Sequence, residues 1–505
     1  MSTNVSENQP ATLTPPHADQ TTIPRSAVIA LVVLLFTAFV MMINETTLAV
    51  ALPSIMAHFS ISAATAQWLL TGFLLTTSVV LPTTGWLIDR FNTRAVFIFA
   101  TSAFLIGTVM AALAPSFTLL LLARVCQAIG TGVIMPLLMT VTMTLVPASR
   151  RGSVMGLTSV VMAVGPALGP TVAGLILSFT TWRGIFWFMV PLMAAAALIG
   201  TAKLTNIGES RATGLDLPSI PLSVLAFGGL VYGLSSVGVI VEGGQAGRRA
   251  LIVLIAGILG LALFVRRQLA RGRKGRALLD LRPLAIPNFT VSLVVLVCLC
   301  GALFGALNTL PLYLQGSISV TALVTGLVLL PGGLLEGFLS PFVGRIFDRR
   351  GPRPLIIPGV ALTTGSLFWL ATGDEHTSVG LVVAIHIIFS IGLALTFTPL
   401  LTTALSSIPK HLYSHGSAIL NTLQQLAGAT GTAVMITIYS RIAATAQTHG
   451  ASGSTAFAMG ARSAFLVSAA VVGVALVASF FITRVPSGSG RIQTAPVAEE
   501  LRSHP

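Results

Sequence analysis

The segment Gly85-Trp-Leu-Ile-Asp-Arg-Phe-Asn-Thr-Arg94 decides the fold, because its pattern returns 259 residues later as Gly344-Arg-Ile-Phe-Asp-Arg-Arg-Gly-Pro-Arg353. Each copy closes a long apolar run with a glycine, an Asp-Arg pair and a further arginine. A charged loop directly after a membrane-length segment is typical of a tight turn at a membrane surface. Two copies predict two related halves of one chain.

The composition excludes a soluble globular protein. Hydrophobic residues make up 54% of the 505 residues and charged residues only 8%, which indicates a polytopic membrane protein. The net charge of +14 is dispersed over short loops rather than gathered on one face, which argues against nucleic-acid binding. The sequence shows no P-loop, catalytic triad order or metal-spaced His/Cys cluster. We therefore expect a secondary transporter without cofactor or metal, driven by protons, rather than an enzyme.

Apolar runs predict fourteen membrane-spanning helices, because about 20 residues at 1.5 Å per residue cross a hydrocarbon core of about 30 Å. The eighth run is the weakest, since its sixteen apolar residues cover only about 24 Å. The predicted spans are 27–52, 66–88, 95–114, 117–146, 153–179, 184–202, 217–241, 250–265, 290–312, 322–342, 355–371, 380–405, 416–439 and 463–482.

The positions of lysine and arginine predict the orientation. With the amino terminus in the cytoplasm, 22 of the 28 basic residues fall on the cytoplasmic side and five on the other, while Arg124 lies inside a span. We therefore expect an even number of spans, with both termini on the cytoplasmic side of the cell membrane. The densest cluster, seven basic residues within 266–282, either contacts anionic lipids or acts only as a topology signal.

The chain is expected to divide into five parts. Residues 1–24 and 485–505 are polar, without an apolar period, and are predicted to be disordered cytoplasmic tails. The first of them also lacks the charged-then-apolar order of a removable signal peptide. Two six-helix halves are predicted at 25–204 and 283–484, and 205–282 holds two extra helices and the basic linker.

Three ionisable residues lie inside the predicted spans, where each costs at least about 2.5 to 3.5 kcal/mol at a helix centre. Glu45 and Arg124 lie at similar depths, about 12 Å and about 10 Å from the outer surface at 1.5 Å per residue. They are expected either to form a static ion pair or to change partners when Glu45 binds a proton. Glu336 lies about 12 Å from the cytoplasmic surface, with no basic residue of a span at its depth. It either exchanges a proton and faces a cationic compound, or stays neutral and hydrogen-bonded to a neighbouring helix.

The repeated loops and the fifth span have a predicted mechanical role. Asp89 and Asp348 are expected to accept hydrogen bonds from helix amino termini or from an arginine across the cytoplasmic seam, so that inward opening must break these contacts. Arg90 and Arg94 are expected to anchor the first loop. The glycines and prolines of 165–170 allow close helix packing and bend the helix.

Four motifs resemble those of the major facilitator superfamily, in its fourteen-helix drug:proton antiporter branch of the EmrB/QacA type. The repeated loop is similar to the cytoplasmic signature between the second and third helices. Arg124 and Gln127 resemble an Arg/Gln motif within the fourth helix. Gly165-Pro-Ala-Leu-Gly-Pro170 is similar to the antiporter motif, and Asn44-Glu-Thr-Thr-Leu-Ala-Val-Ala-Leu-Pro53 resembles the drug-exporter signature of the first helix. The similarity covers 27–483.

Two departures from the family pattern bear on mechanism. Asn92 stands where the loop signature has glycine, which weakens the expectation of a tight turn in the first copy, whereas Gly351 supplies the glycine in the second. Asn44 stands where many members carry aspartate, and Glu45 follows it. One residue along a helix moves the expected proton site by about 100° around the axis.

The resemblance implies an all-α polytopic membrane protein with the major facilitator fold, in which two six-helix halves and two extra central helices make 14 transmembrane helices. It implies multidrug efflux by drug:proton antiport with alternating access, with hydrophobic or cationic small molecules, protons and membrane lipids as partners of a monomer. A proton-coupled exporter or importer of a specific metabolite is the alternative. The expected coupling residues are Asn44, Glu45, Arg124, Gln127 and Glu336. The expected gating residues are Gly85, Asp89, Arg90, Arg94, Gly165, Pro166, Gly169, Pro170, Gly344, Asp348, Arg349 and Arg353.

Overall fold

Every predicted span folds as helix in the computed structural model, which describes residues 23–206, 214, 216–272 and 276–484. The tails predicted to be disordered lie outside these residues, apart from residues 23 and 24. Eleven of the described helices are long and apolar enough to cross a membrane. The three other predicted spans are the broken seventh segment, the 18-residue α14 and the more polar α16. No strand occurs among the described residues, so the all-α prediction is confirmed.

Each half contains six long helices, and several of them begin at a polar cap. Ser116, Thr321, Ser378 and Ser452 each accept the backbone N–H three residues ahead, which satisfies a donor that the first turn leaves free. The N-terminal half contains α1 (Arg25–Phe59), α2 (Ala63–Ala66), α3 (Trp68–Arg90), α4 (Thr93–Ala112), α5 (Phe117–Leu145), η1 (Ala148–Arg150), α6 (Arg151–Phe179) and α7 (Arg183–Lys203). The C-terminal half contains η3 (Arg282–Ala285), α12 (Pro287–Gly316), α13 (Ala322–Arg350), α14 (Arg353–Leu370), α15 (Val379–Ser406), η4 (Lys410–Leu412), α16 (Tyr413–Thr448) and α17 (Gly453–Ser479).

The two extra helices differ from the prediction in regularity and length. The seventh predicted span is broken into α8 (Ser219–Ser223), a π-helical turn η2 (Val224–Gly228), α9 (Gly229–Ser235) and α10 (Val237–Glu242). Its glycines allow backbone contact with the next helix, because a Cβ at Gly229 would stand 2.8 Å from Gly257 Cα. The eighth span, expected to be the weakest, is α11 (Gly244–Gly272), whose 29 residues are ample to cross a bilayer of about 30 Å.

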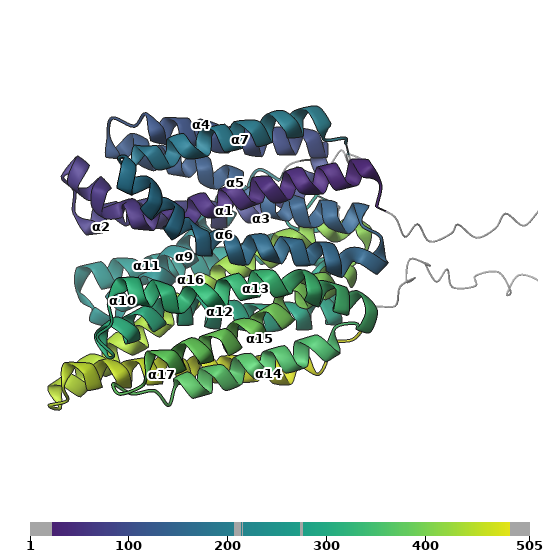
Figure 1. Ribbon diagram of the computed structural model, residues 1–505. Helices are drawn as coiled ribbons and strands as arrows, with labels where there is room; N and C mark the ends of the chain where they lie inside the picture. Colours follow the sequence, from purple (N-terminus) through teal and green to yellow (C-terminus); the bar gives the residue numbers. More distant parts are fainter. Residues whose placement is uncertain (1–22, 207–213, 215, 273–275, 485–505) are drawn as a thin grey trace, which may run out of the picture.

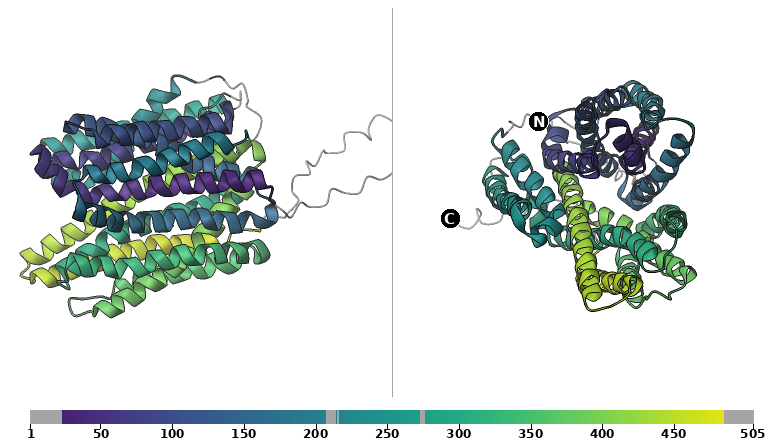
Figure 2. Two further views of the ribbon diagram at one scale, coloured as in Figure 1. Left: turned by 45° about the horizontal axis from the view of Figure 1, so that its top comes forward. Right: turned by 90° about the vertical axis from the view of Figure 1, so that its left-hand side faces the viewer.

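The halves lie side by side, with the extra helices against one flank (Figure 2). The contact between the halves is made chiefly by two helix pairs, α6 with α13 and α3 with α16, with smaller contacts of α5 with α16 and of α15 with α6. The broken segment packs on α3 and α16, while α11 packs on the broken segment. The described chain begins and ends at the same end of the bundle, the end that carries the repeated loops (Figure 1). An even number of spans fits this arrangement.

Candidate functional site

Arg124 is the largest fully buried side chain in the described part of the chain, with 1% of its surface exposed. Its guanidinium donates hydrogen bonds to Asn44 Oδ1 (3.0 Å), Gln127 Oε1 (2.9 Å) and the Leu69 carbonyl oxygen (3.4 Å). It also lies 4.2 Å from the centre of the Phe73 ring, a cation–π distance. Arg124 therefore joins α1, α3 and α5 around one buried positive charge.

The polar cluster around Arg124 extends through neutral amides. Gln127 Nε2 donates to Thr108 Oγ1 (3.0 Å), which connects α5 to α4. Asn44 is 1% exposed, and its Nδ2 has no hydrogen-bond partner among the described residues. A buried amide N–H group without a partner is costly, so Asn44 Nδ2 is free to donate to a further acceptor if one approaches.

Glu45 does not form an ion pair with Arg124 within 4 Å, nor with any other described residue. The static ion pair considered from the sequence is therefore absent from this structure. The reason is rotation about α1, since adjacent residues of a helix point about 100° apart. Asn44 faces Arg124, and the half-buried Glu45 carboxylate beside it has no hydrogen-bond partner among the described residues.

The Gly-Pro segment of α6 packs directly against α1 near Glu45. A Cβ at Gly165 would stand 2.7 Å from Met42 Cβ, and one at Gly169 would stand 3.0 Å from the Ile43 carbonyl oxygen and overlap the Thr46 hydroxyl. Pro166 and Pro170 lie inside the helix, where each removes a backbone hydrogen bond. This part of α6 can therefore approach α1 closely and bend.

The opposite side of the same segment packs against α13 near Glu336. A Cβ at Gly333 of α13 would stand 3.2 Å from Ala167 Cβ, and a Cβ at Gly337 would overlap the Val164 side chain. Glu336 is half-buried, and its carboxylate has no hydrogen bond or ion pair with a described residue. Glu45 and Glu336 therefore lie on helices that pack on either side of one bendable stretch of α6.

The acids of the two repeated loops bind helix amino termini across the seam. Asp348 accepts hydrogen bonds from the backbone N–H groups of Gly152 (2.7 Å) and Ser153 (2.9 Å) and from the Ser153 hydroxyl (2.6 Å), at the start of α6. Asp89 accepts from the Ser414 hydroxyl at the start of α16 and lies 3.3 Å from His415 Nε2. Each half thus supplies an acid that contacts the start of a helix in the other half, Asp348 through two backbone N–H groups and a hydroxyl and Asp89 through two side chains.

His415 connects the first loop to the linker that precedes α12. Its Nδ1 accepts the backbone N–H of Asp280 (3.2 Å), so Nε2 carries the ring proton and donates toward Asp89. Gly85 permits this approach, because a Cβ there would overlap the His415 ring. Neither Ser414 nor His415 was among the residues expected from the sequence. A shared spacing could have indicated this position in the sequence. Pro147 lies five residues before Gly152, which binds Asp348, and Pro409 lies five residues before Ser414, which binds Asp89.

The remaining loop residues have different positions in the two copies. Gly351 has a φ of +82°, a backbone conformation that favours glycine. Asn92, at the equivalent position of the first copy, is extended with a φ of −61°, so no glycine is needed there. Arg94 and Arg349 are exposed, and Arg90 lies at the end of α3. Arg353 donates to the carbonyl oxygens of Ile482 (2.8 Å) and Phe480 (3.2 Å), so it binds the end of its own half.

Hydrogen bonds between the two halves, among the described residues, all lie near the loop end. Besides the loop contacts they join Thr140 to Ser417 (2.9 Å), Thr398 to Ser159 (2.7 Å), Asn421 to Met139 (3.3 Å) and Ser417 to the Pro136 carbonyl (3.2 Å). Toward the other end, a Cβ at Gly174 of α6 or Gly326 of α13 would meet nothing within 4 Å. Among the described residues, the hydrogen bonds that join the two halves are therefore concentrated toward the loop end.

At the loop end, the extra helices are connected by hydrogen bonds and ion pairs to one aspartate, Asp216. Asp216 accepts hydrogen bonds from Arg267 (2.7 and 2.6 Å) and from Ser219, and Arg271 lies 3.7 Å away. The hydrogen bonds from Arg267 hold the pKa of Asp216 below its usual range. In the adjoining linker, burial raises the pKa of Asp280 but the hydrogen bonds from Arg282 outweigh it, so this pKa is also lowered.

The sequence comparison identifies the family that has this architecture. The model of the Major Facilitator Superfamily matches residues 34–432. The chain belongs to the major facilitator superfamily. It is a multi-pass membrane transporter, not an enzyme, and it is close to proteins linked to antibiotic and multidrug resistance.

Three known proteins illustrate this similarity. The chain is 40% identical over 406 residues to the lincomycin resistance protein LmrB of Listeria monocytogenes, covering 80% of this chain and 85% of that protein. It is 28% identical over 400 residues to the multidrug resistance protein B homolog of Mycobacterium tuberculosis, covering 78% and 72%. The solved proton:xylose symporter XylE superposes with a TM-score of 0.64 at 15% identity, covering 92% of this chain and 97% of that one. This last likeness establishes the fold alone.

Asp89→Asn is expected to lower transport about 5- to 150-fold, because an amide accepts less strongly from Ser414 and His415 and such a coupling is worth about 1 to 3 kcal/mol. Initial rates of uptake into proteoliposomes measure the loss, normalised to the amount of purified protein. Asp374→Asn is the control, since Asp374 is exposed and its carboxylate accepts hydrogen bonds only from His376 and Thr377 of its own loop. Wild-type transport by Asp89→Asn contradicts the predicted gating role.

Proposed function

We propose that this chain exports hydrophobic or cationic drug-like compounds in exchange for protons. The observation that carries the proposal is the pair of half-buried carboxylates, Glu45 and Glu336, which have no ion-pair partner among the described residues and flank the Gly-Pro segment of α6. A carboxyl group in the membrane interior without a counter-ion is stable chiefly in its protonated form, so it can carry a proton or neutralise a cation. Antiport requires groups that do both in turn.

Proton binding at Glu45 would act through the charge on Arg124. When Glu45 is ionised, it adds negative charge beside the buried guanidinium, and when it is protonated that attraction is lost. Arg124 is held only by neutral acceptors, so it can shift among Asn44, Gln127 and Glu45. Because α6 touches α1 at Met42 to Thr46, such a shift would change the packing of α6 against α13.

The direction of transport follows from the proposed orientation. Since 22 of 28 basic residues favour the cytoplasm for the loop end, we place this end and both termini there. The contacts between the halves at this end then support a state closed to the cytoplasm. Protons would enter Glu45 from outside in this state, while a compound leaves. The two loop contacts then break so that the cytoplasmic side opens for the next compound.

The resistance-protein relatives support a drug rather than a sugar as the transported compound. Carboxylates facing the interior favour cationic or basic amphiphiles, which combine a positive charge with apolar surface. Lincomycin is therefore a reasonable first compound to test on this chain. A dedicated exporter or importer of one metabolite is the alternative, and it predicts a narrow range of compounds.

Everted membrane vesicles test the proposal directly. Vesicles are acidified by respiration, and a pH-sensitive dye reports proton release when lincomycin or a lipophilic cationic dye is added. Proton release is expected with chemically dissimilar compounds, and a protonophore should abolish uptake of each. Uptake that survives the protonophore contradicts proton antiport, and proton release with one metabolite alone supports the alternative.

A further inference from the structure

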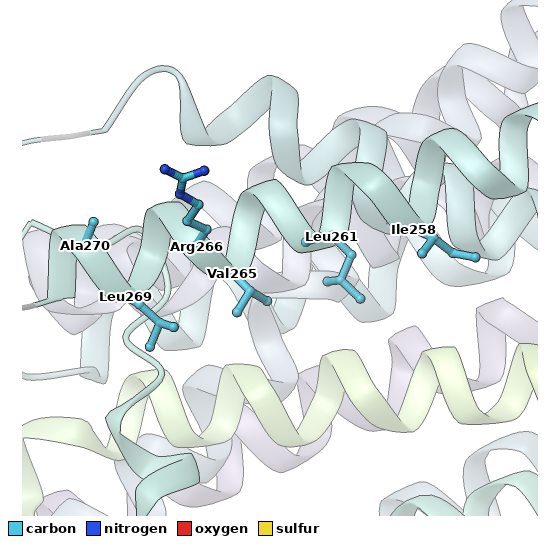
Figure 3. A pocket seen from close by; sticks show the side chains of 7 residues that line it. Ile258, Leu261, Val265, Arg266, Leu269 and Ala270 are labelled. Atoms are coloured by element: carbon cyan, nitrogen blue, oxygen red, sulfur yellow. The ribbon is translucent and has the colours of Figure 1, made fainter.

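An open groove runs along α11 on the flank of the protein. It has a volume of about 750 Å³, and all its lining residues belong to this helix (Figure 3). Leu261, Val265 and Leu269 form one row at helical spacing, and Ala262, Arg266 and Ala270 form the next. The short Ala262 leaves a hollow beside Leu261 and Val265. Arg266 follows one turn later, and its side chain points away from those of Val265 and Leu269 (Figure 3).

Arg266 differs from its basic neighbours in having no partner. Arg267 binds Asp216 at 2.6 Å, and Arg271 approaches the same carboxylate at 3.7 Å. Arg266 is exposed and makes no hydrogen bond or ion pair with any described residue. Among the described residues, the permanently charged guanidinium of Arg266 therefore has no negative partner, whereas Asp216 binds Arg267 next to it.

The position of the groove restricts what can fill it. α11 packs on α8, η2, α9 and α10, and it makes no extensive contact with either six-helix half. Its outer surface is apolar along most of its length, with Ile252, Leu259 and Leu263 more than half exposed. Such a surface faces acyl chains in a bilayer, and Arg266 lies toward the loop end, where lipid headgroups begin.

We propose that this groove binds an anionic glycerophospholipid, with its phosphate on Arg266 and one acyl chain in the hollow over Ala262, one turn nearer the membrane centre. The charge of Arg266 selects an anionic over a zwitterionic headgroup, because a guanidinium binds phosphate through paired N–H groups. The apolar rows supply the contact for the chain. The site does not depend on which compound the protein transports.

Native mass spectrometry of the purified full-length protein tests the site, with phosphatidylglycerol or phosphatidylcholine added to delipidated protein in detergent. Phosphatidylglycerol is expected to bind at least about tenfold more tightly, a difference equivalent to about 1.4 kcal/mol. Arg266→Gln should reduce this preference at least about fivefold, within the range measured for a single lost charged contact. Arg249→Gln is the matched control, since Arg249 is exposed on the same helix toward its other end.

A second variant separates a lipid from a free anion. Ala262→Phe fills the hollow but keeps Arg266, so it should weaken phosphatidylglycerol binding, and inorganic phosphate should not compete with the lipid. Melting temperatures in detergent establish that each variant is folded. Equal binding of the two lipids by the wild-type protein, equal losses in Arg249→Gln and Arg266→Gln, or full binding by Ala262→Phe would each overturn the proposal.

Discussion

Glu45→Gln is expected to abolish drug-driven proton movement while leaving the protein folded. Glutamine has the shape of protonated glutamate but cannot release a proton. Arg124 would therefore remain in the environment that it has when Glu45 is protonated, without a negative charge beside it. Proton release in everted vesicles should fall at least about tenfold, equivalent to about 1.4 kcal/mol. Glu336→Gln should have a similar effect if its carboxylate takes part in the same exchange across α6.

The control for this prediction is Glu242→Gln. Glu242 ends α10, where it is exposed and far in sequence from both carboxylates, so its replacement should leave proton release unchanged. A second measurement separates coupling from binding, because exchange of labelled drug against unlabelled drug requires no net proton transfer. Glu45→Gln should retain this exchange. Normal drug-driven proton release by Glu45→Gln would remove this residue from the coupling mechanism.

Gly344→Ala is expected to force the loop end of the bundle apart. A Cβ at Gly344 would overlap the carbonyl oxygen of Gly152 and lie 2.7 Å from its carbonyl carbon, and backbone cannot move aside as a side chain can. Overpacking of this kind costs about 1 to 3 kcal/mol. The closed state should therefore lose about 5- to 150-fold in population, and transport should fall accordingly.

Cysteine crosslinking measures this effect. Thr140→Cys and Ser417→Cys, placed in a chain without its native cysteines, should crosslink readily because the two hydroxyl oxygens are 2.9 Å apart in the closed state. Adding Gly344→Ala should slow crosslinking. Gly326→Ala is the matched control on the same face of α13, since a Cβ there would meet nothing within 4 Å. Undiminished crosslinking with Gly344→Ala would show that the seam tolerates the methyl group.

The sequence predicted the helices well because their signal is local. Apolar length determines whether a segment crosses a membrane, and all fourteen predicted segments are helical. The break at 224–228 was not predictable in the same way. Gly229, directly after this turn, approaches Gly257 of another helix, and no property of the segment alone specifies that partner.

The candidate site was predicted in part for the same reason. Ionisable residues within spans identified Glu45, Arg124 and Glu336, but depth along a helix does not give direction around it. Asn44, not Glu45, therefore faces Arg124. The acid of the first loop was predicted, whereas its partner His415 was not, because that contact joins residues 326 positions apart through the packing of α3 on α16.

The reciprocal loop contacts have a consequence for membrane energetics. Asp89 and Asp348 bind opposite halves at two separate helix pairs, α3 with α16 and α6 with α13, so loss of one contact leaves the other in place. An ion path through the protein requires both pairs to part while the outer side is still open. Because two contacts must break at once, we expect simultaneous opening on both sides to be rarer than with a single contact. Proton leak through the protein should then be small, and the transporter should not dissipate the proton gradient of the cell.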